Sequence, residues 1–372
     1  MAYFDWSANY PVNEEVLKTF LEVERKCRGN ANSIHREGKE SFGIYKIYNQ
    51  KMLDLLGLSE REYEIIYTSS ATESNNLVIQ GVYKAYQGLG NKIVASEVEH
   101  SSINASLSSL KDEGANIVLV PSTSEGTIDL EKLEDNLDSS TILTCLTSVD
   151  GELGFLEPIE KAQELVEKKT NGFLLVDATQ MIGKFKMDFS KFDFVSFAPH
   201  KYGGIIGTGI LVKRKGIVLS PLLHGGSSVS IYRSGTPAIG LIASTVKATE
   251  IALNNQKNNY QKTKEMQRYL IEGLQNTDGI LINSSLENPY ILNVSIQNKK
   301  GNEVVKELDK RGFEVSQKSA CSIPNTPSKP VMSVYHDKKR ATSSFRISLC
   351  DLNTEEEVAS LLKAIKEIAN GR

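Results

Sequence analysis

Short hydrophobic runs alternate with amphipathic stretches from residue 63 to residue 212. The runs have the length of buried strands, and the stretches between them place hydrophobic residues at helical spacing, as Ile159, Ala162 and Val166 do. This alternation predicts parallel strands covered by helices on both faces of one sheet. The predicted strands are residues 63–69, 92–96, 116–121, 141–149, 172–178, 192–198 and 208–212, and the predicted helices include 73–87, 101–111 and 160–168.

A long polar helical stretch, residues 243–275, follows this region and predicts a link to a second, smaller α+β unit. The chain has 372 residues, which exceeds the size at which one hydrophobic core normally stops growing. We therefore expect a large domain of residues 13–250 and a small domain of residues 251–372 together with residues 1–12. The strands of the small domain are expected near residues 290–295, 313–317 and 344–349.

Polar residues with distinctive chemistry follow two of the predicted strands. One run ends in Asp177, and another ends in Pro199-His200-Lys201. A sheet of this kind binds its ligand where the carboxyl ends of its strands meet. An aspartate there can hold a pyridine nitrogen protonated, and a lysine about two dozen residues later can form a Schiff base with the aldehyde of pyridoxal phosphate. Taken singly, the aspartate also fits a helix cap, and the His-Lys pair also fits a solvated surface.

Together with the order of the elements, these residues resemble the fold-type I pyridoxal phosphate enzymes, and in particular the class V branch that contains the cysteine desulfurases. The resemblance spans nearly the whole chain. It implies pyridoxal 5'-phosphate as the cofactor and a mostly parallel sheet with helices on both faces in the large domain. It also implies that residues 1–12 run beside the small domain or the active site.

The segment Thr68-Ser69-Ser70-Ala71-Thr72-Glu73-Ser74-Asn75-Asn76 follows a predicted strand and opens a predicted helix. Small residues at a helix N-terminus expose backbone N–H groups, which suit a dianion. An ordinary N-cap by Ser70 or Thr72 gives the same local pattern. The resemblance assigns Ser70, Ala71 and Thr72 to the cofactor phosphate, with Ser70 at a position where the family has glycine.

The resemblance implies further cofactor ligands. His100 matches the histidine that stacks on the pyridine ring and shuttles protons, although it also fits a helix N-terminus without a ligand. Gln180 matches the residue that hydrogen-bonds the phenolic oxygen, and His200 matches a phosphate contact. A further phosphate ligand, normally serine, is Ala198 in this chain.

Thr236 lies in Arg233-Ser234-Gly235-Thr236, a tetrapeptide that by itself is an ordinary turn. In the family, the matching segment crosses a dimer interface and offers its threonine to the phosphate of the partner subunit. The resemblance therefore implies that the active site needs a homodimer.

Cys321 is the candidate second nucleophile, in Ser319-Ala320-Cys321-Ser322. Prolines and small polar residues follow in 323–330 and argue against a helix or a central strand. In the family, this thiolate takes the sulfur of L-cysteine as a persulfide while the carbon skeleton leaves as L-alanine. The alternative is a small buried cysteine at a strand end. The other cysteines show no metal-ligand spacing with it, no metal site is expected, and Cys145 fits buried packing.

Arg346 lies in a strand-like segment where the family keeps an arginine for the α-carboxylate of the substrate. The planar guanidinium meets a carboxylate with two parallel hydrogen bonds. An edge residue facing water is the alternative interpretation.

Several positions depart from the family pattern. Gly151 replaces an asparagine that helps to bind cofactor and substrate, Val229 and Ser230 replace a glutamate and an arginine, and Cys350 replaces a glycine. These changes keep open a relative with another substrate, such as a selenocysteine lyase, another carbon-sulfur lyase or an aminotransferase. They also keep open a non-catalytic partner protein with the same fold. Asn9 and Asn32 are candidates to replace the missing hydrogen bonds.

The charge and hydropathy of the chain limit the kinds of binding partner that the sequence predicts. The net charge is -3, from 43 basic and 46 acidic residues that are interspersed, so a direct nucleic acid partner is not expected. No signal-like N-terminus and no run of ~18 apolar residues is present, which predicts a cytoplasmic chain without a membrane span. The favoured hypothesis is a homodimeric cysteine desulfurase that supplies sulfur to an acceptor for iron-sulfur cluster assembly or tRNA thiolation.

Overall fold

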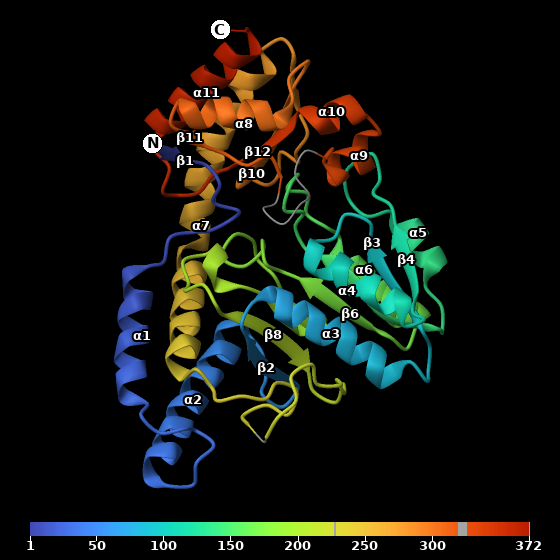
Figure 1. The fold of residues 1–372 in the computed structure, drawn as a ribbon, viewed down its shortest axis with the longest axis vertical. Helices are drawn as coiled ribbons and strands as arrows, with labels where there is room; N and C mark the ends of the chain where they lie inside the picture. The colour runs from blue at the N-terminus through green and yellow to red at the C-terminus, as the bar shows by residue number, and fades with distance from the viewer. Residues whose placement is uncertain (227, 319–325, 372) are drawn as a thin grey trace.

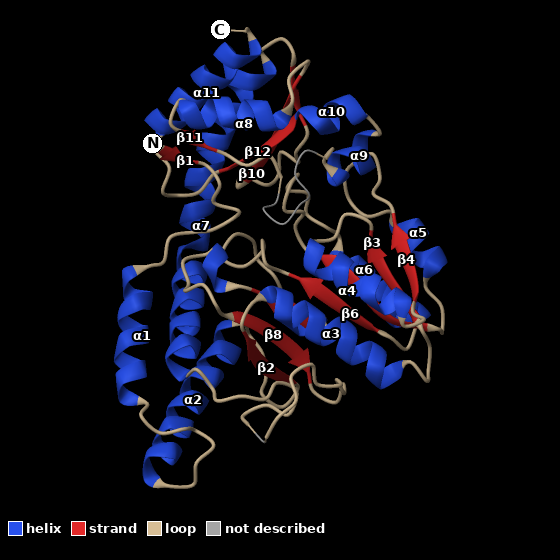
Figure 2. Ribbon diagram, in the orientation of Figure 1, coloured by secondary structure: helices blue, strands red, loops and turns tan. Residues whose placement is uncertain are grey.

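The computed structural model describes residues 1–226, 228–318 and 326–371. Its main feature is a seven-stranded sheet with helices on both faces (Figures 1 and 2). The strand order is β2-β8-β7-β6-β5-β3-β4. These strands are β2 (Tyr63–Thr68), β3 (Lys92–Ser96), β4 (Asn116–Val120), β5 (Thr141–Thr147), β6 (Phe173–Asp177), β7 (Phe194–Phe197) and β8 (Gly209–Arg214).

The prediction of parallel strands is wrong for β8, which pairs antiparallel with both β2 and β7. The other neighbouring pairs of this sheet are parallel. The connection from β7 to β8 contains only the short 3-10 helix Pro199–Lys201. A parallel neighbour requires a crossover of about a dozen or more residues, usually through an α-helix, so the chain turns back instead.

Side chains of this sheet alternate between two hydrophobic clusters. Val176 and Val212 belong to one cluster, and their neighbours Leu175 and Leu211 belong to the other. Because successive strand residues point to opposite faces, both faces of the sheet are covered. Cys145 is fully buried in one of these clusters, as its apolar run predicted. The helices around the sheet are α1 (Glu14–Lys26), α2 (Arg36–Leu55), α3 (Ala71–Tyr86), α4 (Ser101–Asp112), α5 (Leu130–Asn136) and α6 (Ile159–Lys169).

A second, antiparallel sheet has the order β12-β10-β9. The N-terminal strand β1 pairs with β11 beside it, and Phe4 is fully buried in the hydrophobic cluster of this part. The chain then returns to the large sheet, where the backbone N–H of Tyr10 donates to the carbonyl of His200 at 2.9 Å. The elements of this part are β1 (Ala2–Tyr3), β9 (Ile280–Ile282), β10 (Ile291–Ile296), α8 (Gly301–Lys310), β11 (Phe313–Glu314), α9 (Lys329–Tyr335), α10 (Lys338–Ser343), β12 (Ser344–Ser348) and α11 (Glu355–Ala369).

Helix α7 (Ile239–Gln275) runs continuously between the two parts (Figure 1). Val246 packs with the large sheet, whereas Leu270 packs with the second sheet. The predicted division near residue 250 therefore falls inside one helix, and the division itself stays a prediction.

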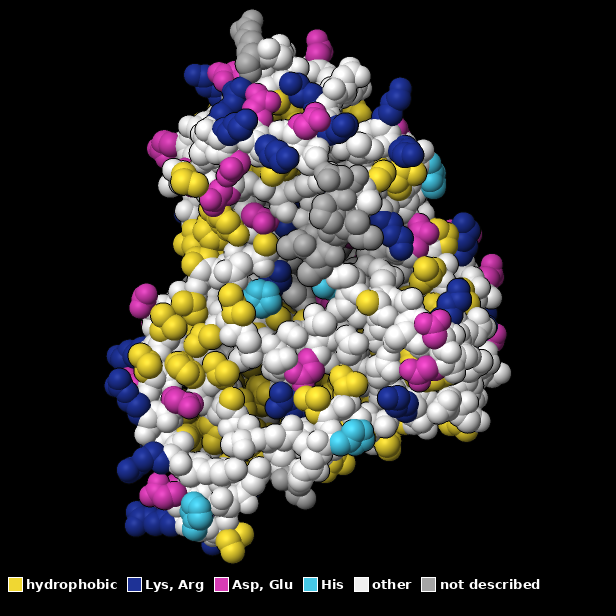
Figure 3. Space-filling view, in the orientation of Figure 1, with side chains coloured by type: hydrophobic (Ala, Val, Ile, Leu, Met, Phe, Trp, Pro, Cys, Tyr) yellow, Lys and Arg dark blue, Asp and Glu magenta, His cyan; other side chains and the backbone are white. Residues whose placement is uncertain are grey.

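No helix among the described residues is both long and apolar enough to cross a membrane. Basic and acidic side chains are interspersed over the face drawn in Figure 3.

Candidate active site

Asp177 ends β6 and is 5% exposed. Its Oδ2 accepts a hydrogen bond from Asn75 Nδ2 at 2.8 Å, and its Oδ1 accepts from the backbone N–H of Thr179 at 3.0 Å. Each carboxylate oxygen has capacity for a further donor. The carboxylate is therefore held in one orientation and can still accept a proton-bearing ring nitrogen.

Asn75 is fully buried on α3 and connects Asp177 to the histidine of the site. Its Nδ2 also donates to Ser102 Oγ at 3.0 Å, and its Oδ1 accepts from the hydroxyl of Ser196. Ser102 Oγ lies 2.9 Å from His100 Nδ1. A continuous network thus joins the ends of β6 and β7 to the start of α4.

His100 is the N-cap of α4, and its Nδ1 accepts from the backbone N–H of Ser102 at 3.2 Å. In this contact Nδ1 presents its lone pair, which leaves Nε2 as the nitrogen that faces a ligand. The ring is exposed, so Nε2 can exchange a proton with a ligand. His100 thus forms the helix N-terminus that the sequence raised as an alternative, and its role at a cofactor stays a prediction.

The segment after β2 forms the N-terminus of α3. Ser70 caps the helix by accepting from the backbone N–H of Glu73 at 3.1 Å, and Glu73 accepts in return from the backbone N–H of Ser69 at 2.7 Å. Gly209 of β8 packs against this loop, since a Cβ there would lie 2.2 Å from the carbonyl carbon of Ser70. The first turn, which holds Ala71 and Thr72, offers N–H groups and partial positive charge to an anion.

Lys201 ends the short helix after β7, and its Nζ donates to two backbone carbonyls, of Ser7 at 2.9 Å and of Ala8 at 2.8 Å. The N-terminal segment therefore lies directly over the amine. Burial, and then the charge of Lys201, lowers the pKa of the neighbouring His200 to about 4, so His200 is neutral near pH 7.

Arg346 of β12 is 2% exposed, so the edge-residue alternative is wrong. Its Nη2 donates to Asp5 Oδ1 at 2.6 Å and its Nη1 to the carbonyl of Gly151 at 2.8 Å. Its Nε is buried and has no partner among the described residues. Asp5 is two residues from Ser7, whose carbonyl accepts from Lys201, so one short N-terminal segment contacts both the guanidinium and the amine.

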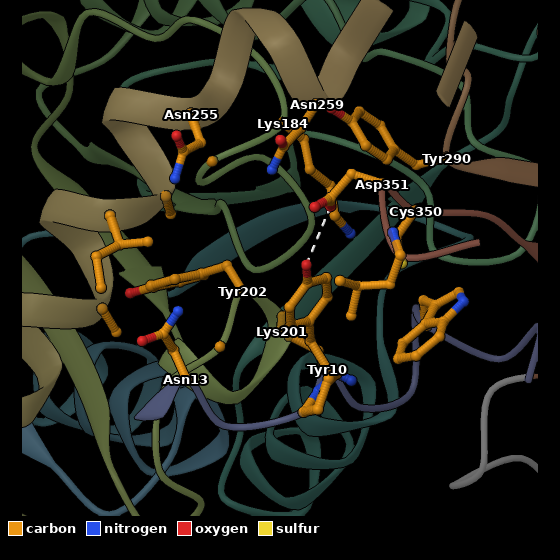
Figure 4. A pocket seen from close by; sticks show the side chains of 18 of the residues that line it. Tyr10, Asn13, Lys184, Lys201, Tyr202, Asn255, Asn259, Tyr290, Cys350 and Asp351 are labelled. Carbon is orange, nitrogen blue, oxygen red and sulfur yellow. Dashed lines mark hydrogen bonds between the residues drawn. The ribbon is translucent and has the colours of Figure 1, made fainter. Parts of the chain in front are cut away.

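A cavity of about 290 Å³ lies beside Lys201, between the N-terminal segment, α7 and the end of β12 (Figure 4). The hydroxyl of Tyr10 donates to Asp351 Oδ1 across it at 3.0 Å. Cys350, at the position of the family's glycine, lines the cavity but is 3% exposed. Burial raises the pKa of its thiol to about 12, which makes it a packing residue and not a nucleophile.

A second cavity, of about 250 Å³, lies beside Ser69 at the end of β2 and is lined by Val229, Ser230 and Arg233. The Nε of Arg233 is 3.0 Å from Glu73 Oε1. Thr236 is exposed nearby, and its Oγ1 accepts from Asn30 Nδ2 at 3.3 Å. Its predicted contact with a partner subunit stays a prediction.

Cys321 and its neighbours 319–325 lie outside the described residues. The chain after them contacts the loop between β5 and α6. Ser328 Oγ donates to Glu152 Oε2 at 2.7 Å, and Val331 of α9 packs against Leu153.

The sequence did not predict the roles that Asn75 and Asp5 have in this site. Asn75 lies inside the segment predicted to bind phosphate, but its role differs, because its side chain points to Asp177. Asp5 pairs with Arg346 across 341 positions of sequence, and no local pattern indicates that contact. The proposed replacements Asn9 and Asn32 stay predictions, and Asn32 Nδ2 donates to Ser228 Oγ at 3.4 Å.

The donor set fits pyridoxal phosphate. A buried carboxylate, an amine and an imidazole stand at strand ends, and a helix N-terminus lies on the same edge of the sheet. Ser7 Oγ and Thr179 Oγ1 are buried without a partner among the described residues, which leaves polar capacity at this edge. When bound, the cofactor supplies an electron sink for the substrate's α-carbon.

This fold and this site define a fold-type I pyridoxal phosphate enzyme. The model of the class-V aminotransferase family matches residues 2–361, and the chain belongs to that family, whose members depend on pyridoxal phosphate.

Individual relatives agree with this membership. The chain is 32% identical to a NifS/IcsS protein homolog of Lactobacillus delbrueckii subsp. bulgaricus, over 99% of this chain and 97% of that protein. It is 33% identical to the cysteine desulfurase IscS of Proteus mirabilis, over 98% of this chain and 91% of that protein. A solved structure of a NifS-like protein superposes with a TM-score of 0.91 at 33% identity and covers both chains fully.

Proposed function

We propose that the chain is a homodimeric, cytoplasmic cysteine desulfurase that converts L-cysteine to L-alanine and passes the sulfur to an acceptor. The observation that carries the proposal is that Asp177 and Lys201 follow the neighbouring strands β6 and β7, while one N-terminal segment contacts both Lys201 and Arg346. Asp177 suits the ring nitrogen of pyridoxal phosphate, Lys201 its aldehyde, and Arg346 the carboxylate of an amino acid.

In this proposal each residue of the site has a separate role. Arg346 binds the substrate carboxylate through the N–H group that has no described partner and through those now shared with Asp5 and Gly151. His100, with Nδ1 engaged by Ser102, exchanges protons at Nε2. Ser70, Ala71, Thr72 and His200 would hold the phosphate, and Gln180 would donate to the phenolic oxygen.

Cys321 takes the sulfur. Its thiolate attacks the sulfur atom of the substrate, an S–S bond forms and the C–S bond breaks. The electron pair of the broken bond stays with the β-carbon, which gains a proton and becomes the methyl group of alanine. The acceptor then removes the outer sulfur from the Cys321 persulfide, for iron-sulfur cluster assembly or tRNA thiolation.

Thr236 supports the homodimer in this proposal. It is exposed on a loop next to the phosphate end of the site, and Asn30 is its described side-chain partner. A threonine there is available to a second subunit.

A second candidate is a relative that acts on a different amino acid, such as selenocysteine. The observation that favours it is Gly151, where a Cβ would meet nothing within 4 Å. The site therefore has open space where the family carries an asparagine.

The test is the production of alanine and sulfide from L-cysteine by the cofactor-loaded protein, with Cys321→Ala beside it under reductant. Cys27→Ala is the matched control, since Cys27 is a partly exposed cysteine. Turnover that survives in the control and disappears in Cys321→Ala supports the proposal. Equal turnover in all three proteins would contradict the role of Cys321, and turnover only with another amino acid would favour the second candidate.

A further inference from the structure

Lys184 lies in the turn after β6, at the edge of the cavity beside Lys201 (Figure 4). Its Nζ donates to Gln180 Oε1 at 2.5 Å, and it lies 5.7 Å from the centre of the Tyr290 ring. Among the described residues Lys184 has no ion pair with a carboxylate. The amide oxygen of Gln180 is thus its described hydrogen-bond acceptor.

Gln180 has a second contact that faces the opposite way. Its Nε2 donates to the carbonyl of Ser7 at 3.0 Å, the same carbonyl that accepts from Lys201 Nζ. A side-chain amide has one oxygen and one NH₂ group, and the two ends can exchange by a flip. Both contacts of Gln180 are satisfied in one of these two orientations.

An ammonium group only donates hydrogen bonds, so it excludes the flipped amide, in which two donors would face each other. The second N–H of Gln180 is then free to point away from Lys184. Gln180 follows Asp177, the last residue of β6, by three positions, and the cofactor ring belongs at this strand end in the proposed function.

We propose that Lys184 is a positioning residue that fixes the amide of Gln180 with its N–H directed to the phenolic oxygen of pyridoxal phosphate. This inference rests on the proposed function, because it assumes the cofactor position given there. It concerns cofactor binding, however, and its test does not require desulfurase turnover.

The surroundings of Lys184 affect its protonation, and thereby its contact with Gln180. Burial, followed by the charges of Lys201 and Arg346, lowers the pKa of Lys184 to about 7. The nearby thiol of Cys350 acts in the opposite direction. The amine is therefore coupled to the cationic groups of the site, and a negatively charged ring oxygen bound nearby would stabilise its charged form.

The experiment is a pH titration of the absorbance of the bound cofactor in the holoenzyme, for wild type and Lys184→Met. An N–H donated to the phenolic oxygen favours the form in which that oxygen carries its full negative charge. Loss of the fixed amide is expected to move the midpoint upward by about one pH unit. Lys186→Met is the matched control, because Lys186 is exposed two residues away, and its midpoint is expected to stay at the wild-type value.

The same titration in Gln180→Leu and in the double variant separates positioning from a direct charge effect. If Lys184 acts through Gln180, the Lys184→Met substitution moves the midpoint little once Gln180 is absent. An equal shift in both backgrounds, or no shift in Lys184→Met, overturns the inference.

Two further variants guard against a folding defect. Lys184→Arg retains the donors and is expected to keep a midpoint near that of wild type. If Lys184→Met does not fold, Lys184→Leu replaces it, because leucine also has no hydrogen-bond donor for Gln180. An unchanged midpoint in Lys184→Leu overturns the inference in that case. Failure of the protein to bind pyridoxal phosphate at all would instead contradict the proposed function.

Discussion

Replacing Asn75 by alanine tests the network that holds Asp177. The substitution removes one side chain that bonds Asp177, Ser102 and Ser196. Ser102 keeps His100 as a partner at 2.9 Å, so its loss is small. Asp177 loses a hydrogen bond to a buried carboxylate, and Ser196 loses its described side-chain acceptor in a position of 0% exposure.

The cost follows from these losses. A hydrogen bond to a charged group is worth about 1.5–3 kcal/mol, and a buried hydroxyl left without a partner costs about 1 kcal/mol or more. Water entering the space vacated by the side chain recovers part of this. We expect Asn75→Ala to lower the free energy of unfolding by about 2–4 kcal/mol.

The assay is urea denaturation of the protein without added cofactor, followed by circular dichroism. Asn76→Ala is the matched control on the same helix. The side chain of Asn76 donates to the carbonyl of Thr72 at 2.9 Å within α3, and alanine is the better helix former, so a change below about 0.5 kcal/mol is expected. A loss in Asn75→Ala no greater than in Asn76→Ala would refute the reasoning.

Three further predictions concern stability and substrate binding. Burial raises the pKa of Glu157 to about 8, so the stability that Glu157 contributes is complete below the unfolded pKa near 4.5 and is lost as the pH rises through 8. Between pH 5 and pH 9, Glu157→Gln should therefore lose less stability than the wild-type protein, by up to about 4 kcal/mol. Parallel profiles of melting temperature against pH for the two proteins would contradict this. Asp5→Ala leaves the buried guanidinium of Arg346 without its carboxylate and should lower the free energy of unfolding, measured by urea denaturation, by about 2–4 kcal/mol. Asp5→Asn keeps an acceptor and should lower it less. Equal losses in the two variants would argue against the ion pair. Gly151→Asn should fold normally because its Cβ meets open space, and should lower the KM for L-cysteine; a loss of folding would show that the space is needed.

The hydrophobic pattern predicted most of the strands of the large sheet, because each buried run is bounded by polar turns. It also predicted that Asp177 and Lys201 lie together, since the carboxyl ends of neighbouring parallel strands meet at one edge. The hydrophobic pattern alone did not give the direction of β8, because a short apolar run has the same composition in either direction. The short connection after β7, which lacks a helix, was the signal that could have given it.

The contacts that complete the site were beyond such patterns. Asp5 and Arg346 meet because the residues after β1 lie beside β12, where an isolated bridge joins Asp5 to Ser348. Asn75 is a polar residue on the buried face of α3, so periodicity alone marks it as a break in the core. Only the positions of Asp177 and Ser196 in space give it a role.

The most direct test of the central claim is the mass of the peptide that contains Cys321 after the cofactor-loaded protein is mixed with L-cysteine. The account predicts one additional sulfur atom on Cys321 in the wild-type protein, removable by a reductant, and none in Lys201→Ala. An unmodified Cys321 in a wild-type protein that nevertheless converts L-cysteine would contradict the account, as would a persulfide that forms equally well without Lys201.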